Sequence, residues 1–143
     1  MHVAEILDTK GYSVVTLKPN NTLADAAHLL VDRGIGTVVV TSGDDIILGI
    51  LSERDIVRAV SKLGASALDA QISEHMTKAV KTVVKSDRVR SLMERMTEGR
   101  FRHMPVVENG RLCGIISIGD VVKSRLGELE AEASAMRDYI ASA

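Results

Sequence analysis

The apolar residues of this chain follow strand spacing and helix spacing in turn, and they do so twice in the same order. The first block predicts a strand, a helix, two strands joined by a hairpin turn, and a helix, at residues 13–17, 23–33, 38–40, 46–51 and 53–62. The second block predicts the same order at residues 82–84, 87–98, 104–107, 112–117 and from about 119. The pattern therefore indicates an α+β fold built from two βαββα repeats.

A short motif shows that the two blocks are copies of one unit. Gly-x-x-Ser-x-x-Asp occurs at residues 49–55 and returns 65 residues later at residues 114–120. Most of the remaining positions align at an offset of 66, and the one extra residue lies in the turn at 41–48, where a change of length is tolerated. A site that is used twice in this way suits symmetric binding of small anions better than a single catalytic centre.

Each unit is too small to bury a core alone, so we expect the two to pack sheet to sheet as one pseudo-twofold domain. Residues 1–66 should form repeat 1 with the N-terminal segment and the start of a small-residue linker at 64–70, and residues 67–127 should form repeat 2. Residues 128–143 should form a C-terminal helical tail. An apolar stripe on this tail has no core to cover, which favours a homodimer in which it packs across a partner subunit: Leu126, Leu129, Ala133, Met136 and Ile140.

The composition excludes several classes of partner. With 45% apolar residues, 26% charged residues and a net charge of −1, the chain has no basic excess for a nucleic-acid backbone. One Phe, two Tyr and no Trp give no stacking platform for single strands. Apolar runs are too short to span a membrane and residues 1–10 lack a signal pattern, so we expect a soluble cytoplasmic protein. The single cysteine, Cys113, excludes an intramolecular disulfide and fits a reducing compartment.

The duplicated motif has two interpretations. A serine followed three residues later by an aspartate is first of all a capping box, which stabilises the start of many helices. Capping does not account for the glycine three residues before each serine, and a glycine there allows a ligand to approach the backbone. A serine hydroxyl and free helix N–H groups suit a phosphate, while the aspartate can accept both hydroxyls of a ribose. Helix capping and nucleotide binding can coexist at this motif.

These residues resemble the CBS domain, named for cystathionine beta-synthase, and residues 1–127 resemble a stand-alone tandem CBS pair, or Bateman module. The resemblance is carried by the Gly-x-x-Ser-x-x-Asp motif in both copies, by the segment at 101–106 before the second hairpin, and by Thr16 and Thr82 on the opening strands. It implies that adenine lies between apolar strand residues, that the aspartate holds ribose, and that Ser, Thr and basic residues hold phosphate.

By matching position, the resemblance implies one cleft for each repeat. The first cleft would use Thr16, Ile35, Gly36, Thr37, Val38, Ser52, Arg54 and Asp55. The second cleft would use Thr82, Phe101, Arg102, His103, Met104, Pro105, Ser117 and Asp120. In a head-to-tail pair the two sites approach each other, so Arg54 is also considered a ligand for the phosphate of the second copy.

The expected function is a non-enzymatic adenine-nucleotide sensor that signals occupancy to a regulated protein partner. AMP is the first choice of ligand, and ADP, ATP or a dinucleotide such as NAD are the others. The alternative is a structural dimerisation module whose capping boxes only cap helices. Neither an enzyme, a catalytic cofactor nor a metal is expected, because Cys113 lies between strand residues and the four histidines lack metal-ligand spacing.

Overall fold

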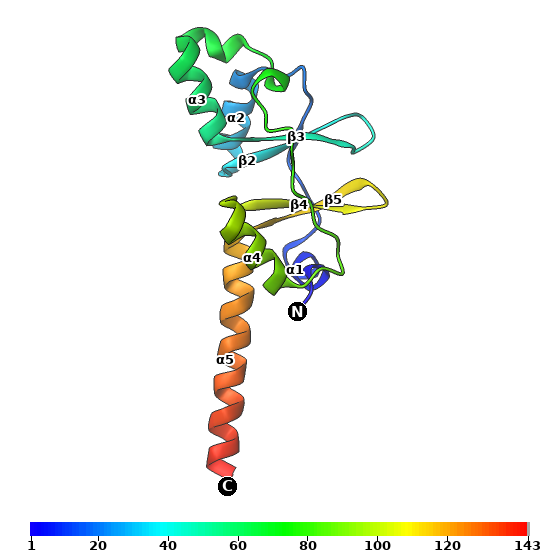
Figure 1. The fold of residues 1–143 in the computed structure, drawn as a ribbon, viewed down its shortest axis with the longest axis vertical. Coiled ribbons are helices and arrows are strands. Elements are labelled where there is room, and N and C mark those ends of the chain that lie inside the picture. The colour runs from blue at the N-terminus through cyan, green and yellow to red at the C-terminus, as the bar shows by residue number, and fades with distance from the viewer. Residues whose placement is uncertain (143) are drawn as a thin grey trace.

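Two small β-sheets, one from each repeat, face each other across the middle of the molecule, with helices on their outer sides (Figure 1). The structure is a computed structural model and describes residues 1–142. The first sheet has the order β1-β2-β3, in which β1 is parallel to β2 and β2 is antiparallel to β3. The elements of the first repeat are β1 (Thr16–Leu17), α2 (Leu23–Arg33), β2 (Thr37–Thr41), β3 (Ile47–Ser52) and α3 (Glu53–Leu63).

The second repeat follows the same order with a shorter first strand. Only Val83 pairs in the segment predicted as a strand at 82–84, through a single parallel bridge to Val106. The remaining elements are α4 (Val89–Gly99), β4 (His103–Glu108), β5 (Arg111–Ser117) and α5 (Ile118–Ser142), with β4 antiparallel to β5. The predicted α+β class and the two βαββα repeats are therefore confirmed.

Local hydrogen bonding explains two departures from the predicted elements. The helix predicted from residue 87 begins at Val89, because the Asp87 carboxylate accepts the Val84 N–H at 2.9 Å and closes a turn before it. The segment predicted as a linker at 64–70 folds into the 3₁₀ helix η1 (Gly64–Asp69), and its Ala67 is buried in the first core. A second 3₁₀ helix, η2 (Ile72–Glu74), follows.

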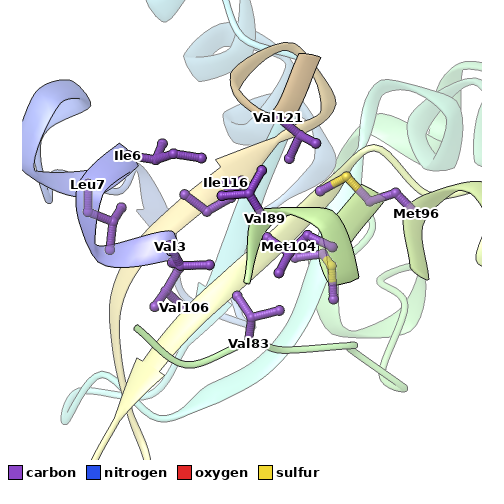
Figure 2. Close-up of a cluster of buried hydrophobic side chains, with 11 residues drawn as sticks. Val3, Ile6, Leu7, Val83, Val89, Met96, Met104, Val106, Ile116 and Val121 are labelled. Carbon is purple, nitrogen blue, oxygen red and sulfur yellow. The ribbon is translucent and has the colours of Figure 1, made fainter. Parts of the chain in front are cut away.

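Each repeat has its own core, and each core is closed by the segment that precedes the other repeat. The helix α1 (Val3–Lys10), which the sequence pattern did not predict, places Val3, Ile6 and Leu7 in the core of the second repeat, beside residues of β4 and β5 (Figure 2). In the same way, Ile72 and Met76 pack into the core of the first repeat. The N-terminal segment assigned by sequence to repeat 1 therefore packs on repeat 2.

The last helix is continuous across residue 127, where the sequence suggested that repeat 2 ends and a tail begins. α5 has 25 residues and projects away from the rest of the molecule (Figure 1). Its first turns pack on the second repeat, where Val121 is fully buried, whereas every described residue from 129 onwards is exposed.

Candidate ligand-binding site between the repeats

A cavity of about 550 Å³ lies between the two repeats and is lined by residues of both. The first repeat contributes the beginning of β2, one residue of β3 and the β3–α3 junction. The second repeat contributes the segment before its first strand and the turn between α4 and β4. The lining residues are Gly36, Thr37, Ile50, Ser52, Glu53, Arg54, Asp55, Thr77, Ala79, Val80, Lys81, Gly99, Arg100, Phe101, Arg102 and His103.

Asp55 is held in one position at the edge of this cavity by the first turn of α3. Its carboxylate accepts the Ser52 N–H at 2.9 Å and the Ser52 hydroxyl at 3.1 Å, while the Ser52 hydroxyl accepts the Asp55 N–H at 3.3 Å. The pair is thus the capping box predicted from sequence. The second carboxylate oxygen is 3.5 Å from the guanidinium of Arg58. Asp55 is only 8% exposed, so its orientation is fixed before any ligand arrives.

Four cations surround the cavity. Arg54, Lys81, Arg100 and Arg102 line it with two acids, Glu53 and Asp55. None of the four cations has an ion-pair partner within the part of the chain that the structure describes. Unpaired arginine side chains can grip two oxygens of an anion at once. The arrangement therefore favours an anionic ligand.

His103 joins the two repeats across the cavity. Its Nδ1 lies 3.2 Å from the Thr37 hydroxyl, so β2 of one repeat and β4 of the other are linked at their first residues. Burial lowers the pKa of His103, and the charges of Lys10 and Arg102 lower it further, against an opposing effect of Asp120. The imidazole is therefore neutral at neutral pH, and it contributes a hydrogen-bonding group to the site and no positive charge.

The apolar part of the cavity is formed by Ile50, Ala79, Val80 and Phe101. The ring of Phe101 lies directly over Gly99, in the space that a Cβ atom at residue 99 would occupy. The absence of a side chain at Gly99 therefore decides where the ring lies. Together these residues form one apolar wall of the cavity, beside the charged residues that line the rest of it.

The second copy of the motif has the same capping box but a different neighbour. The Asp120 carboxylate accepts the Ser117 N–H at 2.9 Å, as Asp55 does with Ser52. The Lys10 ammonium at the end of α1 donates to the same carboxylate at 2.6 Å and to the Ile115 carbonyl at 2.9 Å. Burial alone would raise the pKa of Asp120, but the hydrogen bonds from Lys10 and Ser117 lower it below its usual value. Lys10 therefore occupies one oxygen of the carboxylate that matches Asp55, and the Asp120 side chain stays 23% exposed.

The structure groups the predicted site residues differently from the sequence. The residues expected in two clefts meet in one cavity: Gly36, Thr37, Ser52, Arg54 and Asp55 from the first set and Phe101, Arg102 and His103 from the second. The reason is the head-to-tail packing, which sets the start of α3 in one repeat against the α4–β4 turn of the other. Arg54 accordingly lies in the same cavity as the second-repeat residues, as its position suggested.

The other predicted residues do not line this cavity. Val38, Met104 and Pro105 are buried, and Ile35 packs against the first core. Thr16 is exposed on β1, where it pairs with Val39. Thr82 is half-buried, and Ser117 and Asp120 lie at the Lys10 contact instead.

Several lining residues were missed by sequence reasoning. Thr77, Ala79, Val80 and Lys81 belong to the segment before the second repeat, and Arg100 ends α4 in the left-handed conformation with φ 56°. One signal was available, because residues 75–77 resemble residues 6–8 in sequence. That likeness shows that the segment in front of each repeat belongs to the duplicated unit.

The motif glycines serve packing. A Cβ atom on Gly49 would lie 2.6 Å from the Met76 sulfur, and one on Gly114 would lie 2.8 Å from a Leu7 methyl group. Packing therefore accounts for these glycines, and neither of them lines the cavity. They admit the side chain that closes each core from the opposite repeat.

Within residues 1–142, no group of three or more His, Cys, Asp or Glu side chains is arranged to hold a metal ion. The same residues include no helix that is both long and apolar enough to cross a bilayer.

Two duplicated α+β units that share one charged cavity define a tandem-repeat module, and comparison with known proteins identifies its family. The CBS domain family model matches residues 3–62 and 71–127. The chain belongs to the CBS-domain family, as its motifs indicated. CBS-domain proteins are generally regulatory modules.

Individual relatives agree with this assignment. The crystal structure of the CBS-domain containing protein ATU1752 from Agrobacterium tumefaciens has 51% identity and a TM-score of 0.84, over 87% of this chain and 99% of that one. The CBS domain protein PAE2072 from Pyrobaculum aerophilum, complexed with AMP, has 31% identity and a TM-score of 0.75, over 84% and 89%. An uncharacterised 17.7 kDa protein from Acidianus ambivalens is 38% identical over 125 residues, covering 87% of this chain and 73% of that protein.

Proposed function

We propose that this protein is a non-enzymatic regulatory module that binds one molecule of AMP in the cavity at Asp55. The observation that carries the proposal is the meeting of a fixed carboxylate, four cations without an ion-pair partner in residues 1–142 and an apolar wall in one cavity of about 550 Å³. A nucleoside monophosphate has the matching three parts, a ribose diol, an anionic phosphate and an apolar base. The AMP complex of the relative PAE2072 supports the choice.

The cavity offers residues that suit the ribose and the phosphate of AMP. Asp55 accepts hydrogen bonds from the ribose hydroxyls, and its capping partners keep the carboxylate in place. Arg54, Arg102 and the neighbouring cations bind the phosphate, with His103 as a neutral donor or acceptor. Charged hydrogen bonds are stronger than neutral ones, so adenosine should bind much more weakly than AMP. ADP, ATP and NAD share the same base and ribose and remain alternative ligands.

The two copies of the motif supply a matched pair of variants for the test. Asp55→Asn keeps the side-chain size and the cap but removes the charge from the cavity, and Asp120→Asn makes the same change where Lys10 covers the carboxylate. Calorimetry with AMP should show about a ten- to hundredfold loss of affinity for Asp55→Asn, which is what a lost charged hydrogen bond of roughly 1.5–3 kcal/mol gives. Asp120→Asn should leave the affinity unchanged.

A contrary result would favour the alternative function, a structural dimerisation module. If no adenylate at millimolar concentration raises the thermal midpoint of the native protein, the capping boxes only cap helices. Equal AMP affinity in the native protein and in Asp55→Asn would remove the ribose contact from the proposal.

We further propose that ligand occupancy is passed to a regulated protein partner. The site of action proposed is the cytoplasm, since a single half-buried thiol, Cys113, fits a reducing compartment.

A further inference from the structure

One stripe of apolar residues runs along the whole of α5, with spacings that alternate between three and four positions. They are Gly119, Val122, Leu126, Leu129, Ala133, Met136 and Ile140. This spacing averages 3.5 residues, slightly less than the 3.6 of a straight α-helix. An apolar seam of that period stays in contact with a partner only when two helices wind around each other in a left-handed supercoil.

The seam is exposed over its full length. Val122, Leu126, Leu129, Met136 and Ile140 are 43%, 53%, 45%, 58% and 65% exposed, and none of them belongs to either core. Figure 1 shows the outer half of α5 projecting beyond every other element. A projecting helix of this length is marginally stable in water unless an apolar face is covered. The CBS family match ends at residue 127, so this outer half lies outside the duplicated unit.

The flanking charges decide what covers the seam. With Leu126 and Ala133 at heptad position a, position g holds Arg125 and Glu132 and position e holds Glu130 and Arg137. In a parallel pair of helices, each g residue faces the e residue five positions later in the partner. Arg125 then meets the partner's Glu130, and Glu132 meets the partner's Arg137.

A second copy of the same helix therefore gives Glu130, Glu132 and Arg137 each an opposite charge, and twofold symmetry doubles these pairs. Arg125 already pairs with Glu128 of its own helix at 2.9 Å, and the partner's Glu130 gives it a second acid. An antiparallel pair that overlaps the same exposed segment keeps the contact between Glu130 and Arg137 but sets Glu132 against the partner's Tyr139. The seam also continues to the base of the helix. There a shallow concavity lined by Gly119, Val122 and Leu126 leaves room for the partner helix to begin beside the second repeat.

We propose that two copies of this chain associate through α5 as a parallel two-stranded coiled coil, with both tandem-repeat bodies at the same end. The inference does not depend on nucleotide binding, so its test and the AMP test can fail separately. It sharpens the homodimer expected from the apolar stripe, because it fixes the register, the direction and the charge pairs of the contact.

The first experiment measures the dimer in the full-length protein by sedimentation equilibrium. Met136→Glu places a charge in the seam and should raise the dimer dissociation constant at least about tenfold, since a buried seam position is lost on both chains. Ala131→Glu makes a similar change on the outer face of the same helix and should have little effect. A monomeric native protein, or a dimer that Met136→Glu does not weaken, would overturn the proposal.

The second experiment tests direction by disulfide formation under mild oxidation in a Cys113→Ser background. Leu126→Cys and Ile140→Cys should each form a cross-linked dimer, because a parallel pair sets each seam residue opposite itself. In the antiparallel alternative, residue 140 lies opposite residue 129 of the partner. The two copies of residue 140 are then about 16 Å apart along the axis, at 1.5 Å per residue, and cannot form a disulfide. Failure of Ile140→Cys to cross-link, or equal cross-linking by Ala131→Cys on the outer face, would refute the parallel seam.

The third experiment tests the charge pairs. Glu132→Arg replaces two attractive contacts with two repulsive ones and should weaken the dimer about tenfold at low salt. The double variant Glu132→Arg with Arg137→Glu restores opposite charges at the same places and should return the affinity to near its native value. If the double variant is as weak as the single one, these residues do not face each other in the dimer.

Discussion

Lys10 is expected to stabilise the fold through Asp120, and the variant Lys10→Met tests this contact. The ammonium donates to the Asp120 carboxylate at 2.6 Å and to the Ile115 carbonyl at 2.9 Å, so it ties the end of α1 to the last strand and the last helix. Methionine has an unbranched apolar side chain of similar length but has no donor.

The magnitude follows from how far the contact is exposed. A charged hydrogen bond contributes roughly 1.5–3 kcal/mol when it is shielded from water. The Lys10 side chain is 33% exposed and that of Asp120 is 23% exposed, so solvent screening reduces the contribution. We therefore expect Lys10→Met to lower the free energy of unfolding by about 1 kcal/mol, or about 3 °C in the thermal midpoint of a chain of this size.

Urea denaturation of four proteins isolates the contact: the native protein, Lys10→Met, Asp120→Asn and the double variant. The coupling energy of this cycle should be about 0.5–1 kcal/mol. Because the pKa of Asp120 is lowered in the folded protein, its contribution is present above the unfolded pKa and is lost as pH falls through the folded value. The difference between native protein and Lys10→Met should therefore shrink below about pH 4, where an unperturbed aspartate is protonated.

The control is Lys18→Met, at an exposed lysine whose ammonium forms no ion pair among the described residues. This variant should change the stability by less than about 0.5 kcal/mol. A coupling energy near zero, or a Lys10→Met effect that is the same at pH 7 and at pH 3.5, would show that the ammonium does not stabilise the fold through Asp120.

Three further predictions follow from the site and its packing. Lys10→Ala should uncover Asp120 and add a second, weaker AMP-binding event in calorimetry, and a stoichiometry that stays at one would count against Lys10 as the cover. Because burial lowers the pKa of His103, the imidazole should stay neutral between pH 8 and pH 7, where the phosphate keeps most of its double charge, and AMP affinity measured by calorimetry should be flat over that range. A rise over that range that His103→Gln removes would show that His103 titrates there. Gly49→Ala should destabilise the fold by roughly 1–3 kcal/mol, since its Cβ atom would meet the Met76 sulfur, whereas Gly43→Ala meets nothing within 4 Å and should leave urea denaturation unchanged.

The order of the helices and strands could be predicted because the relevant signals are local. The Ser52 and Ser117 capping boxes start α3 and support the start of α5, and Asn109-Gly110 turns between β4 and β5, as expected for such a pair. The helix α1 was missed because Val3, Ile6 and Leu7 form too short a pattern to stand out. What makes that segment helical is its contact with the second repeat, about a hundred residues later in the chain.

The sequence predicts which kinds of residue form the candidate site, but it does not predict which of them lie together in one cavity. Aligning the two copies shows which positions are equivalent, such as Asp55 and Asp120, but equivalence does not tell which residues are neighbours. Asp55 lines a cavity with Phe101 and His103 of the other repeat, and Asp120 is covered by Lys10. The sequence around each motif does not predict this difference between Asp55 and Asp120. It depends on which side chain the segment in front of each repeat places beside the carboxylate.

The crossed closure of the two cores sets an order of events during synthesis of the chain. The first repeat can bury its core once Met76 has left the ribosome. The residues of α1 precede both repeats but have nothing to pack on until β4 and β5 have been made, so Val3, Ile6 and Leu7 stay in contact with water or with a chaperone until then. A nascent chain that is released before β5 therefore keeps the apolar residues Val3, Ile6 and Leu7 uncovered and is prone to aggregate, even though its first repeat is complete.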